Sequence, residues 1–181
     1  MYAMKPAGIY ALKSLQEDTR YLARLDRMLA AIGRSRDEVR WYDRGDLAEA
    51  ARELGARHVL VVHGHDGLDE ISLSGPTEVA ELRAGEVHRY RLQPSEFGLP
   101  AAPLAALQIA DVKEAAQVFL AVLRNEPGPR RDIVLLNAGA ALYAADVVPD
   151  LATGVERARA AMDSGAAWAK WEALLHCARE L

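Results

Sequence analysis

The fold is decided by residues 58–72, which read HVLVVHGHDGLDEIS. The first five of them are short, β-branched and apolar throughout, which predicts a strand covered by other elements on both faces. A glycine-rich turn follows, and it ends in two adjacent carboxylates, Asp69 and Glu70. Open α/β sheets bind their ligands at the carboxyl ends of their strands. The stretch therefore predicts an α/β domain with a ligand site in the turn after this strand.

Asp69 and Glu70 are the candidate metal ligands. Carboxylates are hard oxygen ligands for Mg²⁺, which usually keeps waters and a substrate phosphate as its other ligands. Adjacent residues of a regular strand point to opposite faces of the sheet, so a shared ion requires a loop here. The alternative interpretation is that both are solvated acidic loop residues. The pattern assigns no catalytic side chain and no substrate-binding residue.

His63 and His65 form a second candidate site at the end of the same strand. The His-x-His spacing puts both imidazoles on one side, an arrangement that binds transition metals. With Asp66 and Asp69 nearby, a metal-dependent hydrolase is an alternative function. We expect two neighbouring histidines to favour their neutral forms.

The chain before this strand reads as helical. A capping-box pattern predicts a helix over residues 14–32, and a second pattern predicts a shorter helix from Ser35 to Gly45 that includes Trp41. A third helix over 46–54 leads into the strand. We therefore expect a helical segment over 1–46 and a domain boundary near residue 46.

The chain after the acidic turn predicts one hairpin and then only helices. Residues 78–82 and 86–92 alternate in polarity around a glycine loop, as in a β-hairpin. Capping and periodicity predict four helices, at 111–125, 132–145, 151–163 and 166–180. The small residues 138–141 would allow close approach by a neighbouring helix.

Four side chains in these helices carry separate expectations. We expect Asn137, inside a very apolar helix, to be a hydrogen-bonded core residue, because an unpaired amide there is costly. Trp168 and Trp171 are expected to pack rather than to bind a ring. Cys177 is expected to be a buried apolar thiol rather than a nucleophile.

Composition excludes several classes of protein. Hydrophobic residues make up 51% of the 181 and charged residues 27%, enough for a globular core. A net charge of −4 gives no basic footprint, so nucleic acid is not expected as a partner. The single cysteine suits a reducing compartment. No apolar run is long enough to span a bilayer, so we expect a soluble, cytoplasmic protein with no membrane partner.

From about residue 47 onward, the chain resembles the C-terminal part of the anthranilate phosphoribosyltransferase family. Four pieces carry the resemblance: ARELGARHVLVVHGHDGLDEISLSGPTEV, AELRAGEVHRYRL with its PSEFGL tail, RDIVLLNAGAALYAADV, and ATGVERARAAMDSGAA. The resemblance implies a nucleoside phosphorylase/phosphoribosyltransferase-like C-terminal region over 47–181. Its expected fold is a partial, mostly parallel sheet around residues 58–92 with an antiparallel hairpin, packed by about six helices.

The resemblance also implies a chemistry. The family transfers phosphoribosyl from phosphoribosyl pyrophosphate (PRPP) to anthranilate in tryptophan biosynthesis, with Mg²⁺ on the leaving pyrophosphate. The Asp-Glu of its DGLDE stretch ligates the magnesium, and these residues match Asp69 and Glu70. PRPP and anthranilate are the implied small-molecule partners, and Mg²⁺ is the implied cofactor.

The departures from the family pattern indicate that this chain lacks part of the family's substrate-binding residues. The family's GTGGD loop, which holds the pyrophosphate, is not found in these 181 residues, nor are its KHGNR and GPLTNP stretches. Residues 1–46 do not resemble the family. We expect no catalysis by this chain alone, and either activity with a complementary N-terminal piece or a non-catalytic, folded interaction module. A homodimer through an exposed sheet edge or the first helix is a further expectation.

Overall fold

The computed structural model describes residues 9–12, 19–31, 33, 35, 39–42 and 44–180. The strands in this part of the chain are β1 (Ile9–Leu12), β2 (Val39–Tyr42), β3 (His58–Gly64), β4 (Thr77–Arg83) and β5 (Glu86–Leu92). The α-helices are α1 (Thr19–Ala31), α2 (Arg44–Glu53), α3 (Val112–Leu123), α4 (Pro129–Ala144), α5 (Leu151–Asp163) and α6 (Ala166–Arg179). Two short 3-10 helices are η3 (Pro94–Phe97) and η4 (Leu104–Leu107). The predicted α/β class is confirmed.

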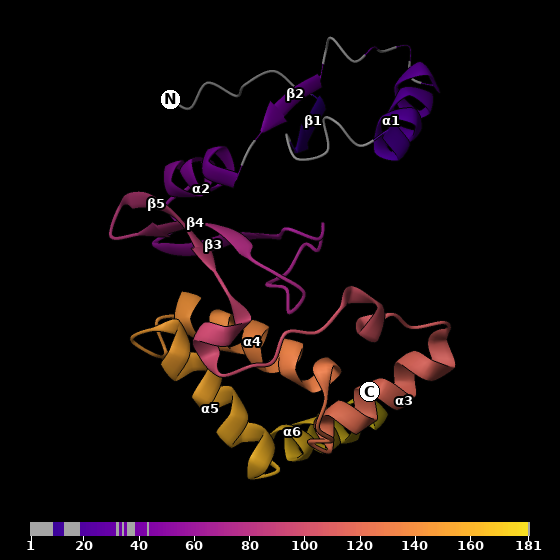
Figure 1. The fold of residues 1–181 in the computed structure, drawn as a ribbon, viewed down its shortest axis with the longest axis vertical. Coiled ribbons are helices and arrows are strands. Elements are labelled where there is room, and N and C mark those ends of the chain that lie inside the picture. Colours follow the sequence, from indigo (N-terminus) through magenta and orange to yellow (C-terminus); the bar gives the residue numbers. More distant parts are fainter. Residues whose placement is uncertain are drawn as a thin grey trace.

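The sheet over residues 58–92 has the order β3-β4-β5 and is antiparallel throughout. The mostly parallel sheet expected here is wrong. Loop 65–76 joins β3 to β4 without a helix, whereas parallel neighbours need a longer crossover that is usually helical. The apolar run in β3 has another cause: α2 lies on one side of the sheet and α4 with α5 on the other (Figure 1).

The predicted hairpin is confirmed and forms the other half of this sheet. Arg83 pairs with Glu86, so Ala84 and Gly85 make a two-residue turn. Both have positive φ, 51° and 83°. Two positive φ values are what a tight turn matching the strand twist requires, and glycine adopts them without strain.

The expected helical segment over residues 1–46 is wrong in part, because it also contains two strands. β1 and β2 form a parallel pair, with Ala11 opposite Trp41, and α1 lies between them in sequence. The helix predicted around Trp41 is therefore wrong. The helix over 14–32 is confirmed where the structure describes it, as α1, while its predicted cap at residue 14 lies outside the described residues.

Two N-terminal caps confirm the helix starts read from the sequence. The carboxylate of Asp111 accepts from the backbone N–H of Glu114 (2.7 Å), and that of Asp150 from Thr153 (2.7 Å). Each satisfies one of the unpaired donors at the start of a helix. These caps fix the starts of α3 and α5, which flank α4 in sequence.

Helices α4 and α5 meet backbone to backbone. A Cβ added to Gly139 would lie 2.6 Å from the backbone nitrogen of Val155, and one added to Gly154 would overlap the carbonyl of Gly139. The expected close approach at residues 138–141 is confirmed. The pair supports a core that links helices, sheet and acidic loop, with Leu136, Val155 and Ile71 among its buried members.

In α6, one expectation about side chains is confirmed and another is wrong. The ring of Trp171 packs edge-on against Phe119, with centroids 4.8 Å apart, and Arg124 lies over the ring of Trp168 at 5.3 Å. The packing role expected for the tryptophans is confirmed. Cys177 is exposed, so its expected burial is wrong. It lies in the last helix, whose residues include none that are buried.

None of the helices in the described part of the chain is both long and apolar enough to cross a membrane.

Candidate metal-binding loop and adjoining groove

The acidic loop, residues 65–76, connects β3 to β4 and carries both predicted metal ligands. Asp69 and Glu70 lie in a bend near its middle, and both side chains are exposed. A bend is the geometry that adjacent carboxylates need to face one ion, since a strand would point them apart. The sequence therefore located the pair correctly in a loop; whether they bind metal stays a prediction.

Asp66 is the hub of the acidic loop. Its Oδ2 accepts from the hydroxyl of Ser72 (2.6 Å) and from that of Ser74, and its Oδ1 accepts from the backbone N–H of Leu68 (3.1 Å). Burial raises the pKa of the Asp66 carboxyl, but these hydrogen bonds outweigh it and hold the pKa below its ordinary value. Asp66 is therefore an ionised structural acceptor, turned inward rather than offered to a ligand.

Gly64 makes room for this hub at the end of β3. A Cβ at this position would lie 2.5 Å from Oδ1 of Asp66 and 3.0 Å from Cβ of Ser72. Its backbone N–H also donates to the carbonyl of Leu68 (2.8 Å), which closes the turn. A larger residue at position 64 would push the Asp66 carboxylate out of this turn.

Asn137 of α4 anchors the other side of the acidic loop. Its Oδ1 accepts from the backbone N–H of Ile71 (2.9 Å), and its Nδ2 donates to the carbonyls of Ile71 (2.9 Å) and Ile133 (3.0 Å). The expected hydrogen-bonded role of Asn137 is confirmed. Its partner, the acidic loop, was not foreseen, because nothing in the sequence pairs residues 66 positions apart.

The two histidines lie at the start of the acidic loop. His63 is half-buried in β3, and His65 is exposed. Burial, and next the positive charge of Arg44, lower the pKa of His63 against the opposing pull of Asp66 and Asp69. The neutral imidazole is favoured, as expected, although its cause is burial and Arg44 rather than a second histidine.

Neither candidate site has a third His, Cys, Asp or Glu ligand among the described residues. In the stretches that the structure describes, no group of three or more His, Cys, Asp or Glu side chains could hold a metal ion. Structural zinc sites use four protein ligands and catalytic ones three, so the His-x-His hydrolase has no supporting constellation there. Two exposed carboxylates still suit Mg²⁺, which takes one or two protein carboxylates and completes its shell with waters and substrate oxygens.

The apolar groove adjoins the acidic loop and has a volume of about 490 Å³. Leu68, Glu70 and Arg130 line part of it, and the rest of the lining is apolar side chains from η4, the segment after it, α3, α4 and α5. Three of these are exposed to an unusual degree for large apolar residues: Ile109 (45%), Phe119 (46%) and Val134 (40%). These side chains give the groove a mainly apolar lining next to Glu70.

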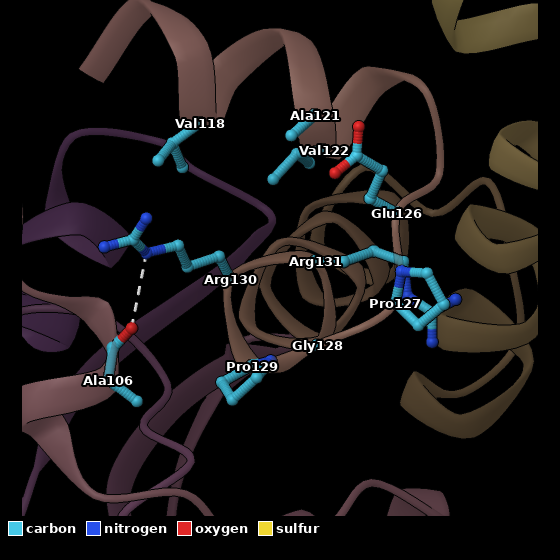
Figure 2. A pocket seen from close by; sticks show the side chains of 10 residues that line it. All are labelled: Ala106, Val118, Ala121, Val122, Glu126, Pro127, Gly128, Pro129, Arg130 and Arg131. Atoms are coloured by element: carbon cyan, nitrogen blue, oxygen red, sulfur yellow. Dashed lines mark hydrogen bonds between the residues drawn. The ribbon is translucent and has the colours of Figure 1, made fainter. Parts of the chain in front are cut away.

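Arg130 braces the end of the groove where α4 begins. Its guanidinium donates to the carbonyls of Ala106 (3.3 Å) and Gln108 (2.7 Å) and to the carboxylate of Glu114 (2.9 Å). Figure 2 shows this side chain reaching from the start of α4 toward Ala106 across a smaller pocket of about 240 Å³. Because its donors are used within the protein, Arg130 acts here as a brace between α4, α3 and η4.

Comparison with known proteins agrees with this architecture. The model of the family described as "Glycosyl transferase family, a/b domain" matches residues 44–168, well over half of the chain. This chain belongs to that family. The match begins at Arg44, the first residue of α2, and the domain boundary expected near residue 46 stays a prediction.

Curated relatives that this chain matches are named anthranilate phosphoribosyltransferases. That of Acidithiobacillus ferrooxidans is 70% identical over 129 residues, which cover 71% of this chain and 38% of the relative. That of Nitrosomonas europaea is 53% identical over 137 residues, covering 76% of this chain and 40% of the relative. The resemblance to the C-terminal portion of these enzymes is confirmed, and the chain spans about 40% of their length.

Solved structures give the same result. The anthranilate phosphoribosyltransferase of Thermus thermophilus matches with a TM-score of 0.63 and 40% identity over 72% of this chain and 40% of that one. The Saccharomyces cerevisiae enzyme in complex with PRPP and Mg matches with a TM-score of 0.69 and 25% identity, over 79% and 42%. Another structure of the yeast enzyme holds 4-fluoroanthranilate.

Proposed function

We propose that this chain supplies the magnesium-binding, C-terminal part of a phosphoribosyltransferase that joins PRPP to anthranilate in tryptophan biosynthesis. The observation that carries the proposal is the acidic loop: Asp69 and Glu70 lie exposed in one bend, beside a groove, in a chain of this family. A related enzyme has been solved with PRPP and Mg.

In this proposal Asp69 and Glu70 hold Mg²⁺. The ion, when bound, neutralises charge on the departing pyrophosphate. The two carboxylates by themselves repel a polyanion, so the diphosphate requires donors facing them from elsewhere. Backbone amides at a glycine loop or helix N-terminus are the usual source of such donors. The family's GTGGD stretch, which would supply such amides, is not found in these 181 residues.

We therefore propose that catalysis requires a complementary N-terminal piece, which brings the diphosphate-binding amides. The apolar groove supports this arrangement, because Ile109, Phe119 and Val134 are left exposed in a position next to Glu70. Covering them removes apolar area from water, at about 25 cal/mol for each Å². A segment seated there would lie beside the metal ligands.

Reconstitution tests the proposal. The chain is mixed with the remaining N-terminal part of the Acidithiobacillus ferrooxidans enzyme, and loss of anthranilate fluorescence is followed with PRPP and Mg²⁺ present. We expect turnover from the mixture and none from either piece alone. In the mixture, Asp69→Asn with Glu70→Gln should reduce turnover about 100-fold, equivalent to roughly 3 kcal/mol of charge stabilisation. Glu172→Gln, which removes an exposed carboxylate on α6, is the control and should have no effect.

The second candidate is a non-catalytic, folded module that serves as an interaction domain. The absence of the GTGGD, KHGNR and GPLTNP stretches from the sequence favours it. It predicts that no complementary piece restores turnover. That result would refute the first proposal.

A further inference from the structure

The bend that carries Asp69 and Glu70 is held at both ends by hydrogen bonds from its backbone to side chains. On one side, the N–H of Leu68 donates to Asp66 (3.1 Å). On the other, the N–H and carbonyl of Ile71 are both bonded to Asn137 (2.9 Å each). The two residues between these fixed points are the proposed metal ligands.

Each holding side chain is itself fixed. Asp66 is bonded by the hydroxyls of Ser72 and Ser74, and Ser72 is fully buried. Asn137 donates to the carbonyl of Ile133 within its own helix, and α4 packs backbone to backbone on α5. The position of the bend is thus set by the sheet on one side and by α4 on the other.

The neighbouring contacts leave the loop little freedom outside the bend. The N–H of Ser72 donates to the hydroxyl of the buried Thr77 (2.9 Å), and that of His65 to the carbonyl of Pro76 (2.9 Å). Ile71 is 1% exposed within the main core. Asp69 and Glu70 have no backbone hydrogen bond among those described, and their side chains are exposed.

We propose that Asp66 and Asn137 are positioning residues, which hold the backbone of Asp69 and Glu70 in the bend that lets both carboxylates face one metal ion. This rests on the metal role assigned to these carboxylates in the proposed function. Neither positioning residue touches the ion. A ligand pair that is already fixed loses less conformational freedom on binding, so affinity rises without a new contact.

Asn137→Ala is the decisive variant because it changes no charge. The probe is Mn²⁺, whose unbound fraction is read by electron paramagnetic resonance on the intact chain. Loss of a group that orients metal ligands typically weakens affinity about 10–100-fold, and we expect the lower end of that range. Asn125→Ala is the control: it also removes a side-chain hydrogen bond of an asparagine, here donated to the Asp163 carboxylate (2.8 Å), far along the sequence from the acidic loop. We expect Mn²⁺ affinity unchanged in the control.

Amide hydrogen exchange gives a second readout that does not depend on metal. We expect Asn137→Ala to accelerate exchange at least about tenfold at Ile71 and its neighbours, without a comparable change in β4 and α5. Ser74→Ala, at an exposed position, guards against a variant that fails to fold; it removes one bond to Asp66 and should accelerate exchange at Leu68.

The outcomes separate the two claims. Unchanged Mn²⁺ affinity in Asn137→Ala, or exchange that accelerates equally across the whole chain, overturns the positioning role. If the wild-type chain takes up no Mn²⁺ at millimolar concentration, the metal role in the proposed function fails. In that case, faster amide exchange confined to residues 68–71 in Asn137→Ala still supports the claim that Asn137 holds the bend. No acceleration at these residues overturns that claim.

Discussion

Glu81 of β4 is hydrogen-bonded by side chains from β3, β5 and α4. The phenols of Tyr90 (2.8 Å) and Tyr143 (2.7 Å) donate to it, and Nε2 of His58 lies 3.1 Å away. Nδ1 of His58 lies 2.8 Å from Asp146, so the buried ring is held on both sides. This cluster ties β3, β4 and β5 to α4.

Burial, followed by the hydrogen bonds to Glu81, raises the pKa of both Tyr90 and Tyr143 above the ordinary value of 10.0. A group with a raised folded-state pKa stabilises the fold fully below its unfolded pKa, and this contribution is lost as pH rises through the folded pKa. We expect these two of the six tyrosines to form tyrosinate at higher pH than the others do. We also expect the free energy of unfolding to fall above about pH 10.

Ultraviolet titration of tyrosinate measures this directly. Tyr143→Phe should remove one late-titrating group and cost about 1–3 kcal/mol, because Glu81 loses a donor while staying buried. All six tyrosines titrating together near the ordinary value would contradict the cluster.

Cys177 gives a second prediction at this scale. Because the thiol is exposed, it should react with a disulfide reagent in the native protein without denaturant. Cys177→Ser should abolish the reaction, as there is one cysteine. Reaction only after unfolding would restore the buried position that the sequence suggested. That expectation failed because the apolar residues around it, such as Leu174 (59% exposed), are themselves not buried.

The close contact between α4 and α5 predicts that a larger side chain at Gly139 destabilises the protein. Gly139→Ala should destabilise the protein by about 1–3 kcal/mol through overpacking against Val155, even though alanine gains roughly 1 kcal/mol of helix propensity. The free energy of unfolding in urea measures the net effect. Gly75→Ala, where an added Cβ meets nothing within 4 Å, is the control and should be neutral. A stabilised Gly139→Ala variant would show that the helices are not in contact there.

Local signals predicted most elements, and non-local pairing explains those that were missed. The cap at Asp111 and the turn at Ala84 and Gly85 act within a few residues and could be predicted from the sequence. β2 was misread as helix because its strand partner, β1, lies some thirty residues earlier. The direction of β3 was misread because an apolar strand looks the same whether its neighbours are parallel or antiparallel.

Some residues of the candidate site could be predicted from local sequence, and others depend on contacts between distant parts of the chain. Its exposed carboxylates could be found from sequence, since Asp69 and Glu70 lie in a recognisable turn. Of the supporting side chains, Asp66 left a signal in the Asp-Gly turn and the two serines that follow it. The anchor from Asn137 left none, because it depends on how α4 lies against the loop.

At the scale of the whole molecule, the apolar groove should promote self-association when no complementary piece covers it. We expect light scattering after size-exclusion chromatography to give a mass above that of one 181-residue chain, and Ile109→Ser with Val134→Ser to lower it. Leu54→Ser, at an 88% exposed leucine outside the groove, is the control. A clean monomer at all concentrations would count against the groove as a contact surface.

We propose that this chain carries the acidic side of a magnesium–diphosphate site and that a complementary piece brings the donors that face it. Isothermal titration of PRPP with Mg²⁺ into the isolated chain tests it most directly. We predict no heat of binding at millimolar ligand. Binding with micromolar affinity by this polypeptide alone would contradict the claim.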